Sequence, residues 1–160
     1  MVAYDAAGGV LCAGVDNNTI KLYDVRNLDK GPFVNFNMKR KLTSQWSNVK
    51  FSPCGTYILA SALDGAIFLL DAFNGNVVRQ YAGHLNQKLT PMETGFSPDA
   101  KFVLAGSEDG SVYIWDTKDH RAKPEILSGH GGPVTAVKWN PKKMLLASAC
   151  STLALWVPQN

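Results

Sequence analysis

An internal repeat of about 45 residues is the feature that most limits what this chain can fold into. The segment "FSPCGTYILASALDGAIFLLD" (51–71) matches "FSPDAKFVLAGSEDGSVYIWD" (96–116) at a constant spacing of 45 positions. An earlier copy, "YDAAGGVLCAGVDNNTIKLYD" (4–24), precedes them, and a later one, "WNPKKMLLASACSTLALW" (139–156), follows. A period of this length indicates a repeat architecture, in which one small unit packs against the next.

Each copy has the pattern of short antiparallel strands. An apolar segment ending in an aromatic residue is followed by a turn, a second apolar segment, a tight turn such as Asp109-Gly110, and an alternating third segment. Fourth strands are predicted at 33–36, 77–81 and 124–127. Helices are disfavoured because Gly, Pro and Asn interrupt every run, and because Val, Ile and aromatic residues fill the apolar positions.

The bulk composition fits one globular domain. The chain has 160 residues, of which 46% are hydrophobic and 18% charged, so it is too apolar to be disordered. A net charge of +3 permits an acidic partner but does not indicate nucleic-acid binding. No run approaches the roughly 18 apolar residues of a membrane span, and residues 1–5 lack the features of a signal peptide. We therefore expect neither a membrane span nor a secretory leader.

The three cysteines predict neither a disulfide framework nor a metal site. Cys12, Cys54 and Cys150 are odd in number, far apart and without a CxxC pair, which fits a reducing compartment. Cys12 and Cys150 fall inside apolar runs, so both are expected to pack as small hydrophobic side chains. The sequence has no glycine-rich phosphate loop and no pair of carboxylates at a working spacing. We therefore expect no cofactor and no metal.

Short motifs beside the repeats indicate their type. Gly-His pairs at 83–84 and 129–130 precede the third and fourth copies, and "IWD" (114–116) closes the third. This pattern resembles a WD40 repeat, which forms one blade of a β-propeller. The resemblance implies an all-β fold, a partial WD40 propeller of about four blades of antiparallel strands with incomplete first and last blades. The fourth copy is interpreted as having lost one turn residue and its Asp.

The predicted organisation is a single WD40-repeat segment over residues 1–160. Its repeats are expected at about 1–36, 46–81, 90–127 and 134–157.

Three irregular segments narrow the resemblance further. They are "VDNNTIKLYDVRNLDKGPF" (15–33), "DAFNGNVV" (71–78) and "LASACSTLALWVP" (146–158). They are similar to the C-terminal half of the Swd-type WD-repeat subunit of COMPASS-like histone H3 lysine methyltransferase complexes. Members of that family carry a ring of about seven blades, whereas this sequence accounts for about four.

One set of residues in the third copy allows two interpretations. The resemblance implies that His84, Ser107, Asp109 and Trp115 form a buried hydrogen-bonded chain that stiffens the blade. A serine hydrolase that uses Ser107, His84 and Asp109 is the alternative. Nothing in the sequence supplies an oxyanion hole, which favours the structural interpretation. His130, whose blade lacks the Asp, is expected to be less constrained.

Two polar stretches remain. Lys39, Arg40 and Lys41 are consecutive cations, which fit either a solvated loop between blades or a contact for an anionic peptide. His120 lies in the polar stretch "TKDHRAK" (117–123) and is expected to be a solvated loop residue.

The functional expectations follow from the resemblance. It implies a non-catalytic scaffold in the nucleus that binds peptides of partner proteins, including subunits of the methyltransferase complex. The phosphorylated tail of RNA polymerase II is the candidate ligand of the basic run, and no direct nucleic-acid contact is expected. A run of about four blades leaves two apolar faces uncovered, so the isolated chain is expected to form a homodimer that completes the propeller.

Overall fold

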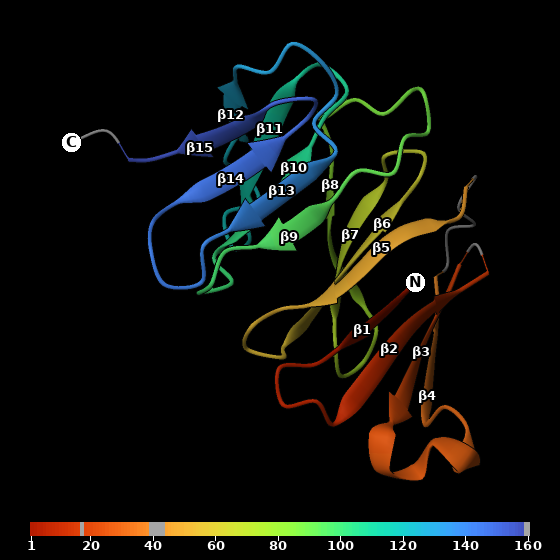
Figure 1. Ribbon diagram of the computed structural model, residues 1–160. Helices are drawn as coiled ribbons and strands as arrows, with labels where there is room; N and C mark the ends of the chain where they lie inside the picture. Colours follow the sequence, from red (N-terminus) through yellow and green to blue (C-terminus); the bar gives the residue numbers. More distant parts are fainter. Residues whose placement is uncertain (17, 39–43, 159–160) are drawn as a thin grey trace. The chain divides into compact units, whose positions relative to one another are not determined.

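The protein is described by a computed structural model that covers residues 1–16, 18–38 and 44–158 (Figure 1). It divides into two compact units, Met1–Tyr81 and Ala82–Asn160. Each unit is built from two antiparallel sheets whose strands follow one another in chain order. Among the described residues, no helix has the length and apolar character needed to cross a membrane.

The first unit contains two four-stranded sheets. The first sheet consists of β1 (Val2–Tyr4), β2 (Val10–Val15), β3 (Thr19–Asp24) and β4 (Val34–Asn37). The second consists of β5 (Trp46–Phe51), β6 (Tyr57–Ala62), β7 (Ile67–Asp71) and β8 (Val77–Tyr81). Their buried residues form one cluster, in which Trp46 meets Phe68 edge to face with ring centroids 6.4 Å apart. Since β7 is buried from Ile67 to Leu70, it is covered on both faces.

The second unit contains a four-stranded and a three-stranded sheet. The third sheet consists of β9 (Thr94–Phe96), β10 (Phe102–Gly106), β11 (Ser111–Asp116) and β12 (Glu125–Ser128). The fourth consists of β13 (Ala136–Trp139), β14 (Leu146–Ala149) and β15 (Leu153–Trp156). Leu104 and Val112 of the third sheet pack in one cluster with Val137 and Leu146 of the fourth. The two sheets therefore share a core.

The all-β architecture predicted from the repeats is confirmed. The fourth strands expected between copies are β4, β8 and β12, and the last sheet has only three strands. The first sheet has four, although its opening strand β1 covers only three residues.

A short 3-10 helix, η1 (Val25–Lys30), follows β3 and was not expected from the sequence. Asp24 starts it by accepting a hydrogen bond from the Arg26 backbone N–H at 2.9 Å, and Gly31 ends it with a φ of 75°. The local polar residues of this insert therefore determine its structure, rather than the repeat.

The tight turn at Asp109-Gly110 joins β10 to β11 as predicted. Gly110 has a φ of 82°, which favours glycine, and a side chain there would also collide with the carbonyl oxygen of His130. Asp109 Oδ1 accepts the Ser111 backbone N–H at 3.0 Å and so closes the turn. This turn therefore places the start of β11 against the loop that leads to the fourth sheet.

Candidate functional site

A buried serine ties the third sheet to the loop that precedes it. Ser107 follows β10 directly and its side chain is 0% exposed. Its Oγ accepts the Leu85 backbone N–H at 2.9 Å, and the Leu85 carbonyl accepts the Glu108 backbone N–H at 2.9 Å. The backbone N–H and C=O of Leu85 are thus both bound to residues directly after β10, which fixes the position of the loop.

The Asp109 carboxylate accepts side-chain hydrogen bonds at this turn. It accepts the Ser107 hydroxyl, and its Oδ2 accepts the Tyr113 hydroxyl at 2.9 Å. Partial burial acts to raise the pKa of Asp109, but the hydrogen bonds from Ser107, Tyr113 and Ser111 outweigh it and lower the pKa. Asp109 is therefore an ionised acceptor at neutral pH.

His84 and Trp115 complete the predicted set through ring contact. The His84 ring lies edge-on to Trp115, with centroids 5.7 Å apart and planes at 82°. The Trp115 indole N–H donates to the Ala82 carbonyl at 3.3 Å. The structure thus brings all four predicted residues together within the third sheet and its preceding loop. The continuous hydrogen-bonded chain through them stays a prediction.

The same geometry bears on the hydrolase alternative. In a catalytic triad the serine hydroxyl donates to histidine and faces the substrate. Here the hydroxyl of Ser107 donates to Asp109, and its oxygen is covered by the Leu85 N–H. Because the side chain has no exposed area, Ser107 is placed to hold the loop rather than to attack a substrate.

The fourth sheet contains a second serine of the same kind, which the sequence analysis missed. The Ser148 side chain is 1% exposed, and its Oγ is 2.7 Å from His130 Nε2. The Trp156 indole N–H donates to the same oxygen at 2.7 Å. The expectation that His130 is the less constrained histidine was wrong, because a histidine, a serine and a tryptophan meet here as well.

The turn that Cys150 begins is shorter than the turn of the third sheet. Ala149 pairs with Leu153, four positions on, whereas Gly106 pairs with Val112, six positions on. The turn shortening predicted for the fourth copy is therefore present, with two residues lost rather than one. By the same register, Ser148 corresponds to Ala105.

The Cys150 thiol accepts a backbone hydrogen bond across its turn, as the Asp109 carboxylate does in the third sheet. Its Sγ lies 3.2 Å from His130 Nδ1 and accepts the Thr152 backbone N–H at 3.4 Å. These contacts hold the thiol at the mouth of the turn. Cys150 is half-buried there and does not pack as a small hydrophobic side chain in the core, as had been expected.

The three thiols differ in their acidity. Burial raises the pKa of Cys12, which is fully enclosed in the first unit, to about 12. The exposed Cys54 has a lowered pKa, because the Ser52 and Thr56 side chains hydrogen-bond to it. Hydrogen bonds from Thr152, then from Ser151 and His130, lower the pKa of Cys150 to about 6.

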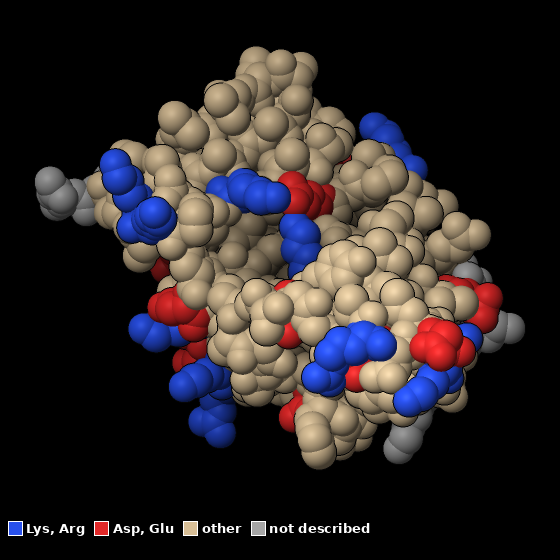
Figure 2. Space-filling view, turned by 60° about the horizontal axis from the view of Figure 1, so that its bottom comes forward, with Lys and Arg blue, Asp and Glu red and all other residues tan. Residues whose placement is uncertain are grey.

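The charged residues do not gather into a basic stripe on the face in view. Figure 2 shows Lys and Arg side chains scattered among Asp and Glu there. The predicted anionic-peptide contact, Lys39, Arg40 and Lys41, lies outside the described residues. His120 is exposed, as expected. In the described part of the chain, no group of three His, Cys, Asp or Glu side chains could hold a metal ion.

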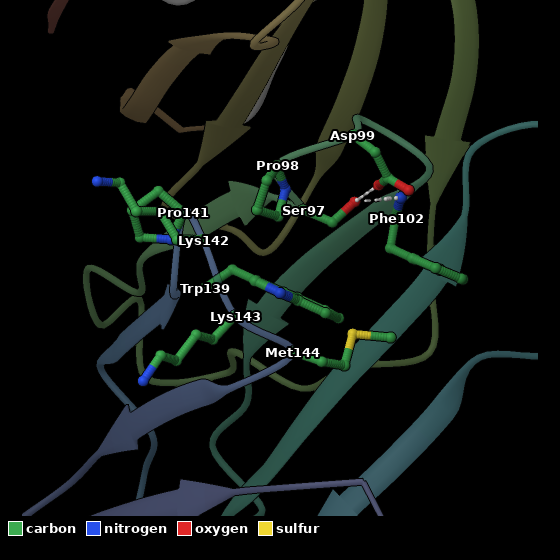
Figure 3. Close-up of a pocket in the computed structure, with 9 residues that line it drawn as sticks. All are labelled: Ser97, Pro98, Asp99, Phe102, Trp139, Pro141, Lys142, Lys143 and Met144. Carbon is green, nitrogen blue, oxygen red and sulfur yellow. Dashed lines mark hydrogen bonds between the residues drawn. The ribbon is translucent and has the colours of Figure 1, made fainter.

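A groove that the sequence analysis did not predict lies between two turns of the second unit (Figure 3). One turn joins β9 to β10, and the other joins β13 to β14. The Trp139 ring is stacked parallel to the Phe102 ring at 6.3 Å, and the hollow around them is about 250 Å³. The residues that line it include Pro98, Phe102, Trp139, Lys142, Lys143 and Met144. No sequence signal points to it, because Phe102 and Trp139 belong to different repeats.

Replacing Ser148 by alanine tests the hydrogen bonds that its side chain makes with His130 and Trp156. Ser148→Ala should lower the free energy of unfolding by about 2 kcal/mol, because His130 Nε2 and the Trp156 indole lose their shared buried partner. Ser151→Ala, three positions along in the exposed turn, is the control and should change it by less than about 0.5 kcal/mol. Urea denaturation followed by fluorescence measures both. Equal stability of the two variants would contradict the assignment.

Alkylation by iodoacetamide tests the acidity of Cys150. Since the thiolate is the reactive form, the rate at Cys150 should rise as the pH passes through about 6, while Cys12 stays unreactive in the folded protein. Mass spectrometry of the digested protein measures each site separately. Thr152→Val removes the strongest hydrogen bond and should move the midpoint upward. A midpoint for Cys150 near the ordinary thiol value of 9 would refute the assignment.

Known proteins with similar sequences carry the same repeats. The family described as "WD domain, G-beta repeat" matches residues 75–116 and 123–156. WD repeat-containing protein 82 of Drosophila melanogaster is 45% identical over 159 residues, which is 99% of this chain and 50% of the relative. Protein ANTHESIS POMOTING FACTOR 1 of Arabidopsis thaliana is 32% identical over 99% of this chain and 47% of its own.

A third relative matches over a shorter stretch, and its name states the complex to which it belongs. COMPASS component SWD2 of Saccharomyces cerevisiae is 32% identical over 83 residues, which is 51% of this chain and 25% of the relative. The chain spans about half the length of the first two relatives. Together with the four antiparallel sheets, these matches show that the chain is a WD40-repeat protein.

Proposed function

We propose that this chain is a non-catalytic adaptor subunit of a nuclear assembly that methylates lysines of histone H3 and acts with the transcription machinery. The observation that carries the proposal is the 45% identity to fly WD repeat-containing protein 82 over 99% of the chain. The match to a yeast protein named as a COMPASS component supports it. COMPASS-like methyltransferase subunits are therefore the proposed partners.

The architecture suits an adaptor. Antiparallel sheets hold many short turns at fixed positions, and the buried centres at Ser107 and Ser148 restrain the loops before them. A preorganised loop loses little conformational entropy when a partner binds, so more of the contact energy is available as affinity. WD40 relatives commonly act in this way, as scaffolds without catalysis of their own.

A serine hydrolase is the weaker candidate. Ser107, His84 and Asp109 lie together, but Ser107 is enclosed and its hydroxyl donates to the carboxylate. Asp109 also accepts the Tyr113 hydroxyl, so it is a structural acceptor in this turn. The proposal therefore assigns these three residues to stability.

The basic run Lys39, Arg40 and Lys41 is proposed as a contact for an anionic peptide, with the phosphorylated tail of RNA polymerase II as the candidate. Three consecutive cations in the sequence support this proposal. Guanidinium and ammonium groups bind phosphate by charge-assisted hydrogen bonds.

Affinity purification from nuclear extract of the source organism tests the adaptor role. The tagged 160-residue chain should recover subunits of a histone methyltransferase complex, identified by mass spectrometry. A chain with Trp115→Ala, which removes a buried ring from the third sheet, is the control. Proteins that this variant also recovers bind without the intact fold. Failure of the folded chain to recover any methyltransferase subunit would overturn the proposal.

Exposed apolar side chains on two edge strands support a homodimer of the isolated chain. Val2 and Tyr4 on β1 are 69% and 61% exposed, and Leu153 and Leu155 on β15 are 70% and 61% exposed. Exposed apolar strands of this kind favour pairing with another chain. We propose that β1 and β15 are covered by a second copy.

Light scattering tests the dimer. The isolated chain should have twice the monomer mass of 17.4 kDa at micromolar concentration, because pairing removes these side chains from water. Replacing both leucines, by Leu153→Lys and Leu155→Lys, should give monomers. A stable, soluble monomer of the unchanged protein across the micromolar range would rule out the homodimer.

A further inference from the structure

The turn between β13 and β14 differs from the three equivalent turns of the other sheets. In those turns a backbone hydrogen bond closes the loop, from Gly8 to Asp5, from Gly55 to Ser52, and from Ala100 to Ser97. The residue that donates has a positive φ in each case. This shared geometry makes the fourth turn, residues 140–145, stand out as an exception.

The fourth turn is held by a side chain instead. Asn140 Oδ1 accepts the backbone N–H groups of Lys142 and Lys143 at 2.9 and 3.0 Å. The Leu145 N–H then donates to the Lys143 carbonyl at 2.8 Å. With the backbone fixed in this way, both lysine side chains project from the turn into solvent.

The charge at this turn is reversed relative to the third sheet. Lys142 stands at the repeat position of Asp99, whose carboxylate pairs with Lys101 at 3.2 Å. The ion pairs formed among the described residues include neither Lys142 nor Lys143. The fourth turn therefore presents two positive charges that no described residue neutralises in an ion pair.

The apolar side chains beside these two lysines are also accessible to solvent. Met144 is 63% exposed, and the stacked rings of Trp139 and Phe102 are only half-buried. Figure 3 shows Phe102 and Met144 toward one end of the groove, while Lys142 and Lys143 extend toward the other. The hollow of about 250 Å³ lies below the size of an ordinary small-molecule pocket and fits one or two side chains.

We propose that this groove docks a short segment of a partner protein in which an apolar side chain is adjacent to acidic residues. The apolar side chain lies on Trp139 and Met144, and the carboxylates pair with Lys142 and Lys143. Asp99 lies at the opposite rim and repels a carboxylate there, so the acidic residues bind at the lysine end only. The inference rests on the proposed adaptor function, to which it adds a surface and a ligand chemistry.

A nuclear magnetic resonance titration tests the docking. The 15N-labelled 160-residue chain is titrated with peptides of the form Gly-Ser-Gly-Leu-Asp-Glu-Gly-Ser, with Leu, Met, Phe or Tyr as anchor and the acidic pair before or after it. At about 1 mM peptide, at least one should shift the Trp139 indole signal, assigned through Trp139→Phe. The matching peptides with Asn-Gln for Asp-Glu, or Gly for the anchor, should not.

Paired charge reversals give the matched control. Lys142→Glu with Lys143→Glu should weaken binding about tenfold or more, because two attractions become repulsions. Lys118→Glu with Lys123→Glu makes the same change of net charge at exposed positions outside the groove and should alter binding less than about twofold.

Three results would overturn the proposal. They are no shift of Trp139 with any of the peptides, equal weakening by both reversals, and binding only of a peptide that carries phosphoserine in place of the acidic pair. A shift confined to β1 or β15 would likewise show that the peptide binds elsewhere. Peptide binding at the groove together with failure to recover methyltransferase subunits would leave the docking site intact and end the adaptor role.

Discussion

The second unit depends on one buried serine hydroxyl in each sheet, directly after β10 in the third sheet and within β14 in the fourth. Ser107 binds the loop before the third sheet, and Ser148 joins His130 to Trp156 in the fourth. Such a buried group is costly when it is left without a partner, by about 1 to 3 kcal/mol, so each serine selects one position of the loop around it. Packing between the sheets follows from these fixed positions.

The first unit reaches a similar sheet structure by other means. In the second sheet, Ala62 stands at the position of Ser107 and Leu70 at that of Trp115. Both are buried, together with the edge-to-face rings of Trp46 and Phe68. A repeat of this fold can therefore form its four-stranded sheet without a serine and a tryptophan at these two positions. The polar centres add fixed loop positions, which a surface for partner binding requires.

Because the chain repeats itself, each departure from the repeat can be read against the other copies. The strands, the positive-φ turn at Gly110 and the meander order followed from hydrophobic alternation and turn residues, which are local signals. The role of Cys150 was missed because it follows an apolar run and begins a turn that is shorter than its counterpart in the third sheet, where Asp109 stands.

The groove could not be predicted from spacing. Phe102 and Trp139 come from different repeats, and their stacking depends on how the third and fourth sheets pack, which no local pattern encodes. The exposure of Met144 has the same origin. Sequence reasoning instead selected the basic run at 39–41, because consecutive cations are visible without a fold. Open surfaces that combine two turns need the structure.

The tryptophans of the second unit have two separate roles. Trp115 and Trp156 donate their indole N–H groups to the Ala82 carbonyl and to Ser148 Oγ, whereas the half-buried Trp139 donates no such bond within the described residues. Hydrogen exchange of the assigned indole N–H groups measures this directly. We expect slow exchange at Trp115 and Trp156 and fast exchange at Trp139. Protection of Trp139 equal to theirs, or fast exchange at Trp156, would contradict this expectation.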